Sequence, residues 1–239
     1  MSTVELRDVW VYYGERPALR GVSAVFTPGV HVVLGRNGSG KTTLLRAIAR
    51  LVDFRGEVTV MGRRVRELRR RDLAKLVGYC WQNPYYGFIE ATVQDELNAI
   101  LNTLRVEGDW RVVEILVPSE LLERDPSTLS GGEAKRVSIA SILVADQPVW
   151  LLDEPFTYLD RSGVKSIVEL VEYGRGRGKT IIVAGHEVFY ASLLKPDTYI
   201  LLDNGVVARR GSWGSLSNSV LEEAGVLPMG DLCASLCAT

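Results

Sequence analysis

The chain has 239 residues, of which 46% are hydrophobic and 24% are charged, and its formal net charge at pH 7 is −1. These values are typical of a globular protein with a sizeable core, and they exclude a strong overall charge that would steer the chain to nucleic acid or to a membrane surface. No apolar stretch approaches the roughly 18–20 residues of a membrane-spanning helix, and the first residues lack the pattern of a secretory signal, so we expect any membrane association to depend on a partner.

The first third of the chain predicts strands followed by a helix. Residues 4–13, 20–26 and 30–35 alternate in polarity or are rich in β-branched side chains, with turns at YGERP and TPG. The next segment, GRNGSGKTTLLRAIARL, changes from glycines to an apolar period of 3.6 residues, which predicts a loop that opens a helix. EVTVMG and VGYCWQ predict two further strands.

A dense basic stretch, RRVRELRRRDLAK (63–75), lies between those two strands. We interpret it as the solvated face of a surface helix, and the alternative is a patch for lipid headgroups or nucleic acid. Three cysteines, Cys80, Cys233 and Cys237, form no disulfide framework, which favours a reducing, cytosolic setting. No histidine lies near Cys233 and Cys237 in the sequence, so they give only weak support for a metal site.

The pattern changes between about 84 and 130, where QDELNAILNTLRV and WRVVEIL have helical spacing. Strands and helices then alternate again: PVWLLDEP, KTIIVAGHE and DTYILLDNGVVARRG predict strands, and SGVKSIVELVEYG predicts an amphipathic helix. This order predicts an α/β fold with a mostly parallel sheet, flanked by an N-terminal antiparallel β subdomain. We expect a core built from residues 1–83 and 131–239, and an inserted helical subdomain over residues 84–130.

The strongest motif is G-x4-G-K-[ST], which a predicted strand precedes and a predicted helix follows. Glycines let backbone N–H groups surround phosphate oxygens, and a helix N-terminus adds partial positive charge. Lys41 can reach the outer phosphates of a nucleotide, and the Thr42 hydroxyl can ligate Mg²⁺. The segment therefore predicts a phosphate-binding loop made of Gly35, Asn37, Gly38, Ser39, Gly40, Lys41, Thr42 and Thr43.

Polar residues also end three of the predicted strands. Asp153, after VWLL, would hold Mg²⁺ directly or through water, and Glu154 would orient or deprotonate a water that attacks the γ-phosphate. His186, after TIIVAG, could contact the γ-phosphate and hold that water in line. Gln82, after VGYCW, could sense Mg²⁺ and the γ-phosphate. Gln82 and His186 are each unremarkable alone. The catalytic interpretation of Asp153 and Glu154 is favoured because a phosphate loop lies upstream in the sequence.

The sequence LSGGEAKR (129–136) places a serine and two glycines at the predicted start of a helix. No base stands beside Ser130 in the sequence, so it is a poor candidate nucleophile. A helix N-terminus with small residues is an anion site. The chain thus carries a second phosphate-binding element besides a complete phosphate loop.

Taken together, these motifs resemble the nucleotide-binding subunit of ABC ATPases across nearly the whole chain. They occur in the order of that family: phosphate loop 35–42, Gln82, LSGGE at 129–133, Asp153-Glu154, Leu159-Asp160 and His186. The resemblance implies a P-loop NTPase core that binds ATP and Mg²⁺, with Thr42, Gln82 and Asp153 on the metal and with Glu154, His186, Lys41 and Gln82 in catalysis.

The resemblance also implies a head-to-tail pair of such subunits. Ser130, Gly131 and Gly132 of one subunit would then bind the γ-phosphate of the ATP held by the phosphate loop of the other. Asp160 would lie at the interface between the two subunits. Tyr13, before GERPAL, matches the aromatic residue that stacks on adenine in the family, although a strand tyrosine could equally pack in the core.

The stretch GYCWQNPYYGFIEATVQDEL (78–97) is similar to the ATPases of energy-coupling-factor and cobalt or nickel importers. The resemblance implies a peripheral ATPase at the cytoplasmic face of the cell membrane that powers import of a vitamin or metal ion through an integral membrane subunit. The second ATPase subunit would be a copy of this chain or a close paralogue. The segment between Gln82 and Leu129 is shorter than that branch would have, and YGF replaces more polar residues after Gln-Asn-Pro.

A soluble ABC ATPase of a cytosolic assembly machine, such as iron–sulfur cluster biogenesis, is the alternative, because it would share all the catalytic motifs. An ABC protein that acts on nucleic acid is disfavoured, since the chain has neither a long coiled-coil insertion nor two ATPase cassettes. Both Glu154 and His186 are present, so we expect an active ATP hydrolase. Glu133, where glutamine is common, and Tyr158, before Leu159-Asp160, are variants that we expect to be tolerated.

Overall fold

The computed structural model of the chain describes residues 3–223 and 226. The C-terminal residues Cys233 and Cys237 lie outside the described residues. Within the described part of the chain, no helix is both long enough and apolar enough to cross a membrane.

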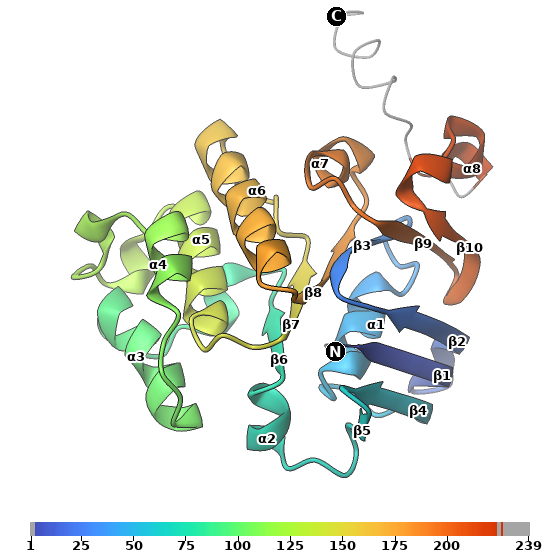
Figure 1. Cartoon of the computed structure of the whole chain (residues 1–239), viewed down its shortest axis with the longest axis horizontal. Helices are drawn as coiled ribbons and strands as arrows, with labels where there is room; N and C mark the ends of the chain where they lie inside the picture. The colour runs from blue at the N-terminus through green and yellow to red at the C-terminus, as the bar shows by residue number, and fades with distance from the viewer. Residues whose placement is uncertain (1–2, 224–225, 227–239) are drawn as a thin grey trace, which may run out of the picture.

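A six-stranded sheet lies at the centre of the molecule, in the order β10-β9-β3-β8-β7-β6 (Figure 1). The five strands from β9 to β6 run parallel, and β10 pairs antiparallel with β9. Every residue of β7 is buried, which explains why the strand is one apolar run instead of an alternating one. The strands are β3 (Gly29–Leu34), β6 (Val77–Cys80), β7 (Val149–Asp153), β8 (Thr180–Gly185), β9 (Thr198–Asp203) and β10 (Val206–Ser212).

A second, antiparallel sheet with the order β2-β1-β4-β5 lies beside the first. Its strands are β1 (Val4–Tyr13), β2 (Arg16–Phe26), β4 (Arg55–Val60) and β5 (Arg63–Arg64). Its buried side chains and those of helix α1 (Lys41–Ile48) belong to one apolar core with β7 and β8. The predicted α/β fold with a mostly parallel sheet and a flanking antiparallel sheet is confirmed.

Three helices, α3 (Val93–Leu104), α4 (Trp110–Leu116) and α5 (Gly131–Leu143), gather on one side of the parallel sheet (Figure 1). They share a second apolar core with α6 (Arg161–Gly176), in which Trp150 of β7 is fully buried. The division of the chain at residues 84 and 130 stays a prediction. The other helices are α2 (Arg70–Ala74), α7 (Val188–Leu193) and α8 (Asn218–Glu223), with 3₁₀ turns at Pro84–Tyr86, Ser119–Leu121, Pro126–Thr128 and Trp213–Ser215.

The basic stretch 63–75 differs from the surface helix that the sequence predicts. Only Arg70–Ala74 is helical, and the rest consists of the short strand β5 and a turn. Arg64 pairs with Glu57 and Glu67, at 3.3 and 3.5 Å. Most charged side chains of the stretch are therefore exposed as expected, and two of its arginines, Arg64 and Arg69, are paired with carboxylates, of which only Glu57 lies outside residues 63–75.

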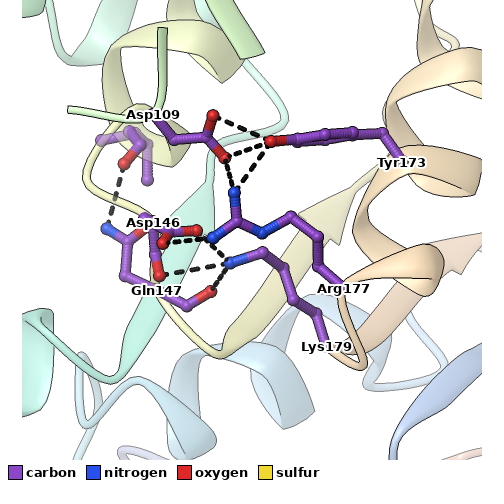
Figure 2. Close-up of polar contacts among 7 residues, drawn as sticks. Asp109, Asp146, Gln147, Tyr173, Arg177 and Lys179 are labelled. Carbon is purple, nitrogen blue, oxygen red and sulfur yellow. Dashed lines mark hydrogen bonds and ion pairs between the residues drawn. The ribbon is translucent and has the colours of Figure 1, made fainter. Parts of the chain in front are cut away.

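A polar cluster joins the helical region to the core at the amino-terminal ends of β7 and β8 (Figure 2). The Tyr173 hydroxyl on α6 donates to the Asp109 carboxylate at 2.9 Å, and Arg177 pairs with Asp109 at 3.1 Å and with Asp146 at 2.8 Å. The Lys179 ammonium donates to the Asp146 carboxylate at 2.6 Å and to its carbonyl oxygen at 3.2 Å, and to the carbonyl oxygen of Gln147 at 2.8 Å. We call these residues, Asp109, Asp146, Gln147, Tyr173, Arg177 and Lys179, the amino-edge cluster.

Candidate active site

The loop between β3 and α1 has a backbone that requires glycine. Gly35, Gly38 and Gly40 have φ angles of 154°, 81° and 107°, which L side chains rarely adopt. A Cβ atom on Gly35 would lie 2.3 Å from the carbonyl oxygen of Leu202, so no other residue fits there. The loop leads directly into the N-terminus of α1, as the phosphate-loop motif predicts.

Lys41 is the first residue of α1, and its side chain is buried. Its ammonium donates to the carbonyl oxygens of Gly35 at 2.8 Å and Arg36 at 3.2 Å, and it lies 3.9 Å from the Glu154 carboxylate. Burial lowers the pKa of Lys41, and the carboxylates of Glu154 and Asp153 oppose that shift. The Lys41 ammonium thus lies over the loop, where the outer phosphate groups of a nucleotide would bind.

The Ser39 hydroxyl in the same loop is buried and has no hydrogen-bond partner among the described residues. An orphaned buried hydroxyl is costly unless something binds it. A phosphate oxygen would satisfy it, so the loop fits the nucleotide that its sequence predicts.

Asp153 ends β7 and accepts two hydrogen bonds. The Thr42 hydroxyl donates to Oδ1 at 3.0 Å, and the Tyr79 hydroxyl donates to Oδ2 at 3.0 Å. Burial raises the pKa of Asp153, and these two hydrogen bonds oppose the shift. A hydroxyl and a carboxylate in contact are the oxygen ligands that Mg²⁺ prefers, so the pair fits the predicted cation.

Glu154 follows with a φ of 48°, an uncommon conformation for a residue other than glycine. Its N–H donates to the carbonyl oxygen of Ala184 in β8 at 2.9 Å, which fixes the turn. The carboxylate lies 3.1 Å from Nδ1 of His186 through either oxygen. Since an ionised carboxylate only accepts, Nδ1 carries the proton of this bond and Nε2 faces elsewhere.

A cavity of about 860 Å³ opens over the phosphate loop. Tyr13 at the end of β1 is 50% exposed and lines this cavity, so it does not pack in the core. Gly35, Ser39, Asp153 and His186 are not among the residues that line it. The sequence-predicted residues that line it are Tyr13, Asn37, Gly38, Gly40, Lys41, Thr42, Thr43, Gln82 and Glu154.

The second predicted phosphate element lies away from this cavity. Ser130 begins α5 with a reciprocal cap: Glu133 N–H donates to the Ser130 hydroxyl at 3.4 Å, and Ser130 N–H donates to the Glu133 carboxylate at 2.8 Å. Neither Ser130, Gly131 nor Gly132 lines the cavity. A Cβ on Gly132 would lie 3.0 Å from the Tyr158 carbonyl oxygen, so this loop packs on the segment that carries Leu159 and Asp160.

The comparisons with known proteins decide the family. The family model described as ABC transporter matches residues 19–157. The chain is 36% identical over 217 residues to the energy-coupling factor transporter ATP-binding protein EcfA1 of Thermotoga maritima, which covers 88% of this chain and 82% of the relative. The chain belongs to the ABC transporter ATP-binding family. It is an ATP hydrolase of the ABC type.

Two further comparisons agree with this assignment. The energy-coupling factor transporter ATP-binding protein EcfA of Carboxydothermus hydrogenoformans is 33% identical over 236 residues, covering 93% of this chain and 86% of the relative. The solved dimer of the ATP-binding cassette MJ0796, in a post-hydrolysis state with ADP and Pi, has a TM-score of 0.76 at 25% identity, covering 87% of this chain and 98% of that one. The predicted resemblance to ABC ATPases is therefore confirmed.

Within this ABC cassette, the sequence did not identify two residues that hold candidate site residues in place. Tyr79 bonds Asp153, but in the sequence it is only one aromatic residue of a predicted strand. Lys135 of α5 donates to three carbonyl oxygens beside the site. An amphipathic helix shows from its sequence pattern which side chains face solvent. Helix α5 is buried on most of its faces and lacks such a pattern, so the sequence does not tell whether Lys135 is buried or exposed. The charged residues Glu133 and Arg136 flank Lys135, so the sequence holds no clear signal that it is the buried one.

Proposed function

We propose that this ABC cassette is the ATP-hydrolysing subunit of an importer, and that two such subunits pair head to tail. The observation that carries the pairing is that the Ser130–Gly132 loop does not line the cavity over the phosphate loop of the same chain. The cavity over Lys41 holds a phosphate loop and Glu154, while the Ser130–Gly132 loop is a second anion site that does not reach this cavity. A second subunit would bring its own Ser130–Gly132 loop onto the phosphates.

The proposed chemistry at the cavity needs mainly positioning and charge neutralisation. Lys41 and the N–H groups of the loop neutralise the outer phosphates. Glu154 accepts a proton from the attacking water, and His186, oriented through its Nδ1–H, presents Nε2 to the γ-phosphate. Thr42 and Asp153, with Gln82 lining the same cavity as Thr42, would hold Mg²⁺, whose positive charge would help to neutralise the phosphates. Tyr13 would stack on adenine at the open side of the cavity.

The membrane partner is proposed from an exposed apolar segment. Tyr86 and Ile89, on either side of Phe88, are 71% and 81% exposed, and Tyr85 is 46% exposed. Such a concentration of exposed apolar side chains marks an interaction surface. The segment follows Gln82 directly, so movement at the nucleotide could reach a partner there. The names of the two energy-coupling factor relatives support a transport system. Import of a vitamin or a metal ion, and a place at the cytoplasmic face of the membrane, are proposed from the resemblance of residues 78–97.

The pairing is tested with Glu154→Gln. Losing the base should slow ATP hydrolysis by on the order of 10² to 10⁴ fold, while ATP binding persists, because Lys41 and the loop are untouched. With saturating Mg-ATP the purified variant should then elute as a dimer in size-exclusion chromatography. Glu169→Gln, which changes an exposed carboxylate on α6, is the matched control and should behave as wild type. A Glu154→Gln protein that stays monomeric contradicts the head-to-tail pair.

The importer is tested separately by affinity purification of the tagged chain from its native membranes in mild detergent. A polytopic membrane protein in stoichiometric amounts is the expected result. Recovery of soluble partners alone would replace the importer by a cytosolic assembly ATPase, with the chemistry at Lys41 and Glu154 unchanged.

A further inference from the structure

Lys135 is a fully buried lysine on α5, five residues after Ser130. Its ammonium donates to the carbonyl oxygens of Trp81 at 2.8 Å, Gln82 at 3.1 Å and Asp153 at 3.3 Å. Trp81 and Gln82 follow β6, and Asp153 ends β7. Lys135, on the helix that Ser130 caps, therefore binds the backbone at the carboxyl ends of two neighbouring strands, β6 and β7.

The ammonium of lysine has three N–H donors, and each of these contacts uses one. Lys135 thus has no donor left for substrate, so its role is to position the groups around it. Burial lowers the pKa of Lys135 to about 8, and the Cys80 thiol and the carboxylates of Asp153 and Glu154 oppose the shift. Burying a charged group is unfavourable unless hydrogen bonds or ion pairs replace its contacts with water, and the three carbonyl oxygens fill that role here.

Lys179 offers a comparison within the same molecule. It is also a buried lysine with three oxygen partners, but these belong to Asp146 and Gln147, at the opposite edge of the sheet. None of its partners is a candidate site residue. Lys135, in contrast, binds the backbone of two candidate site residues, Gln82 and Asp153. Its helix, α5, begins with the loop that we propose binds the partner's nucleotide.

We propose that Lys135 is a positioning residue that couples the two nucleotide-binding elements of one subunit. Through its three carbonyl contacts, a change at Gln82 or Asp153 on ATP binding moves α5, and with it the Ser130–Gly132 loop that this subunit offers to its partner. The inference rests on the proposed head-to-tail pair for its consequence, although the coupling itself lies within one chain.

The coupling is tested by hydrogen exchange with mass spectrometry on protein dilute enough to be monomeric. In wild type, saturating Mg-ATP should change exchange both in the phosphate-loop peptides and in peptides from the start of α5. In Lys135→Met the change at the phosphate loop should persist and the change in α5 should disappear. Lys179→Met is the matched control, since it also removes a buried ammonium, and it should keep both changes.

Steady-state kinetics give a second measure of the same coupling. Lys135→Met should lower kcat by about tenfold or more, with little change in KM, whereas Lys179→Met should lower the melting temperature and leave kcat unchanged. Should Lys135→Met fail to fold, Lys135→Gln removes the charge and one of the three N–H groups at lower cost to packing, and the same pattern is expected in milder form.

Three results would overturn the proposal: no ATP-dependent change in α5 of wild type, a change that survives in Lys135→Met, or an equal loss in Lys179→Met. Each is independent of the pairing test, because exchange is measured on the monomer. A Glu154→Gln protein that does not dimerise would therefore remove the proposed pair while the exchange result still decides the role of Lys135.

Discussion

The two edges of the parallel sheet are built from the same residue types but differ in how completely their charged groups are paired. At the amino edge, Lys179, Arg177 and the carboxylates of Asp109 and Asp146 bond mainly to one another, and the Asp109 side chain is only 8% exposed (Figure 2). At the carboxyl edge, Lys41 and Glu154 line an open cavity, and the Ser39 hydroxyl has no partner among the described residues.

This difference separates stability from function. The charged groups of the amino-edge cluster are already paired with one another, and Gln147 Oε1 is the buried side-chain atom there without a partner among the described residues. These paired charges contribute to holding α4, α6 and the sheet together. An open network leaves donors and acceptors for a substrate, and its strained turn at Glu154 shows that the fold accepts a local cost there. Changes at the two edges should therefore have opposite signatures in activity and in stability.

The largest expected effect is at the open edge. Lys41→Met should reduce ATP hydrolysis by at least about 100-fold, because it removes a preorganised charge from the phosphates. The melting temperature should change little, since the ammonium in the free protein donates to the two loop carbonyls of Gly35 and Arg36 and has one longer ion pair, 3.9 Å from the Glu154 carboxylate. Steady-state ATPase assays and thermal unfolding measure both quantities. Hydrolysis at the wild-type rate would show that the cavity over Lys41 is not the ATP site.

A smaller and opposite effect is expected at the closed edge. Asp109→Ala leaves the Tyr173 hydroxyl and part of the Arg177 guanidinium without their acceptor, which should lower the free energy of unfolding by about 2 kcal/mol. The kcat of the folded protein should not change. Denaturant titration gives the stability, and Glu114→Ala, which removes an exposed partner of Arg111, is the control with an effect under about 0.5 kcal/mol. A fall in kcat for Asp109→Ala would mean that the two edges are coupled.

The sequence predicted the open edge far better than the closed one. The spacing of Gly35, Lys41 and Thr42 and the order of strand and helix around them are local, so a linear pattern contains them. The amino-edge cluster joins Asp109, Asp146 and Tyr173, which are far apart in the chain and belong to no motif. Its contacts depend on how helices α4 and α6 pack, which periodicity does not determine.

One prediction was wrong in detail, and one residue has a contact that the sequence analysis did not name. The stretch 63–75 has helical composition, but Arg63–Arg64 adds a strand to the antiparallel sheet, because pairing with β4 satisfies its backbone. Glu133, expected only to be tolerated in place of glutamine, closes the cap with Ser130 and lies 3.6 Å from Arg124. A tertiary neighbour decides the first outcome, whereas the cap between Ser130 and Glu133 is a local S-x-x-E pattern that the sequence itself contains. The roles of the individual site residues stay predictions until variants such as Glu154→Gln are measured.

The smallest effect concerns Cys80, which is buried at the end of β6, beneath the open edge. Burial raises the pKa of its thiol from 9.0 to about 12, against the opposing charge of Lys135. Between those two pH values the folded protein keeps the proton and the unfolded chain loses it, so this group makes folding less favourable as pH rises.

Between pH 8 and pH 9.5 the free energy of unfolding of wild type should therefore fall by about 0.8 kcal/mol more than that of Cys80→Ala. Denaturant titrations of both proteins at the two pH values measure this difference, and the same pair in a Lys135→Met background removes the one titrating group whose pKa Cys80 itself shifts. Equal pH dependence would mean that the thiol ionises in the folded state as readily as in the unfolded chain. In that case water reaches Cys80 at the carboxyl end of β6. The contrast between the open cavity and a buried layer of side chains beneath it would then be wrong.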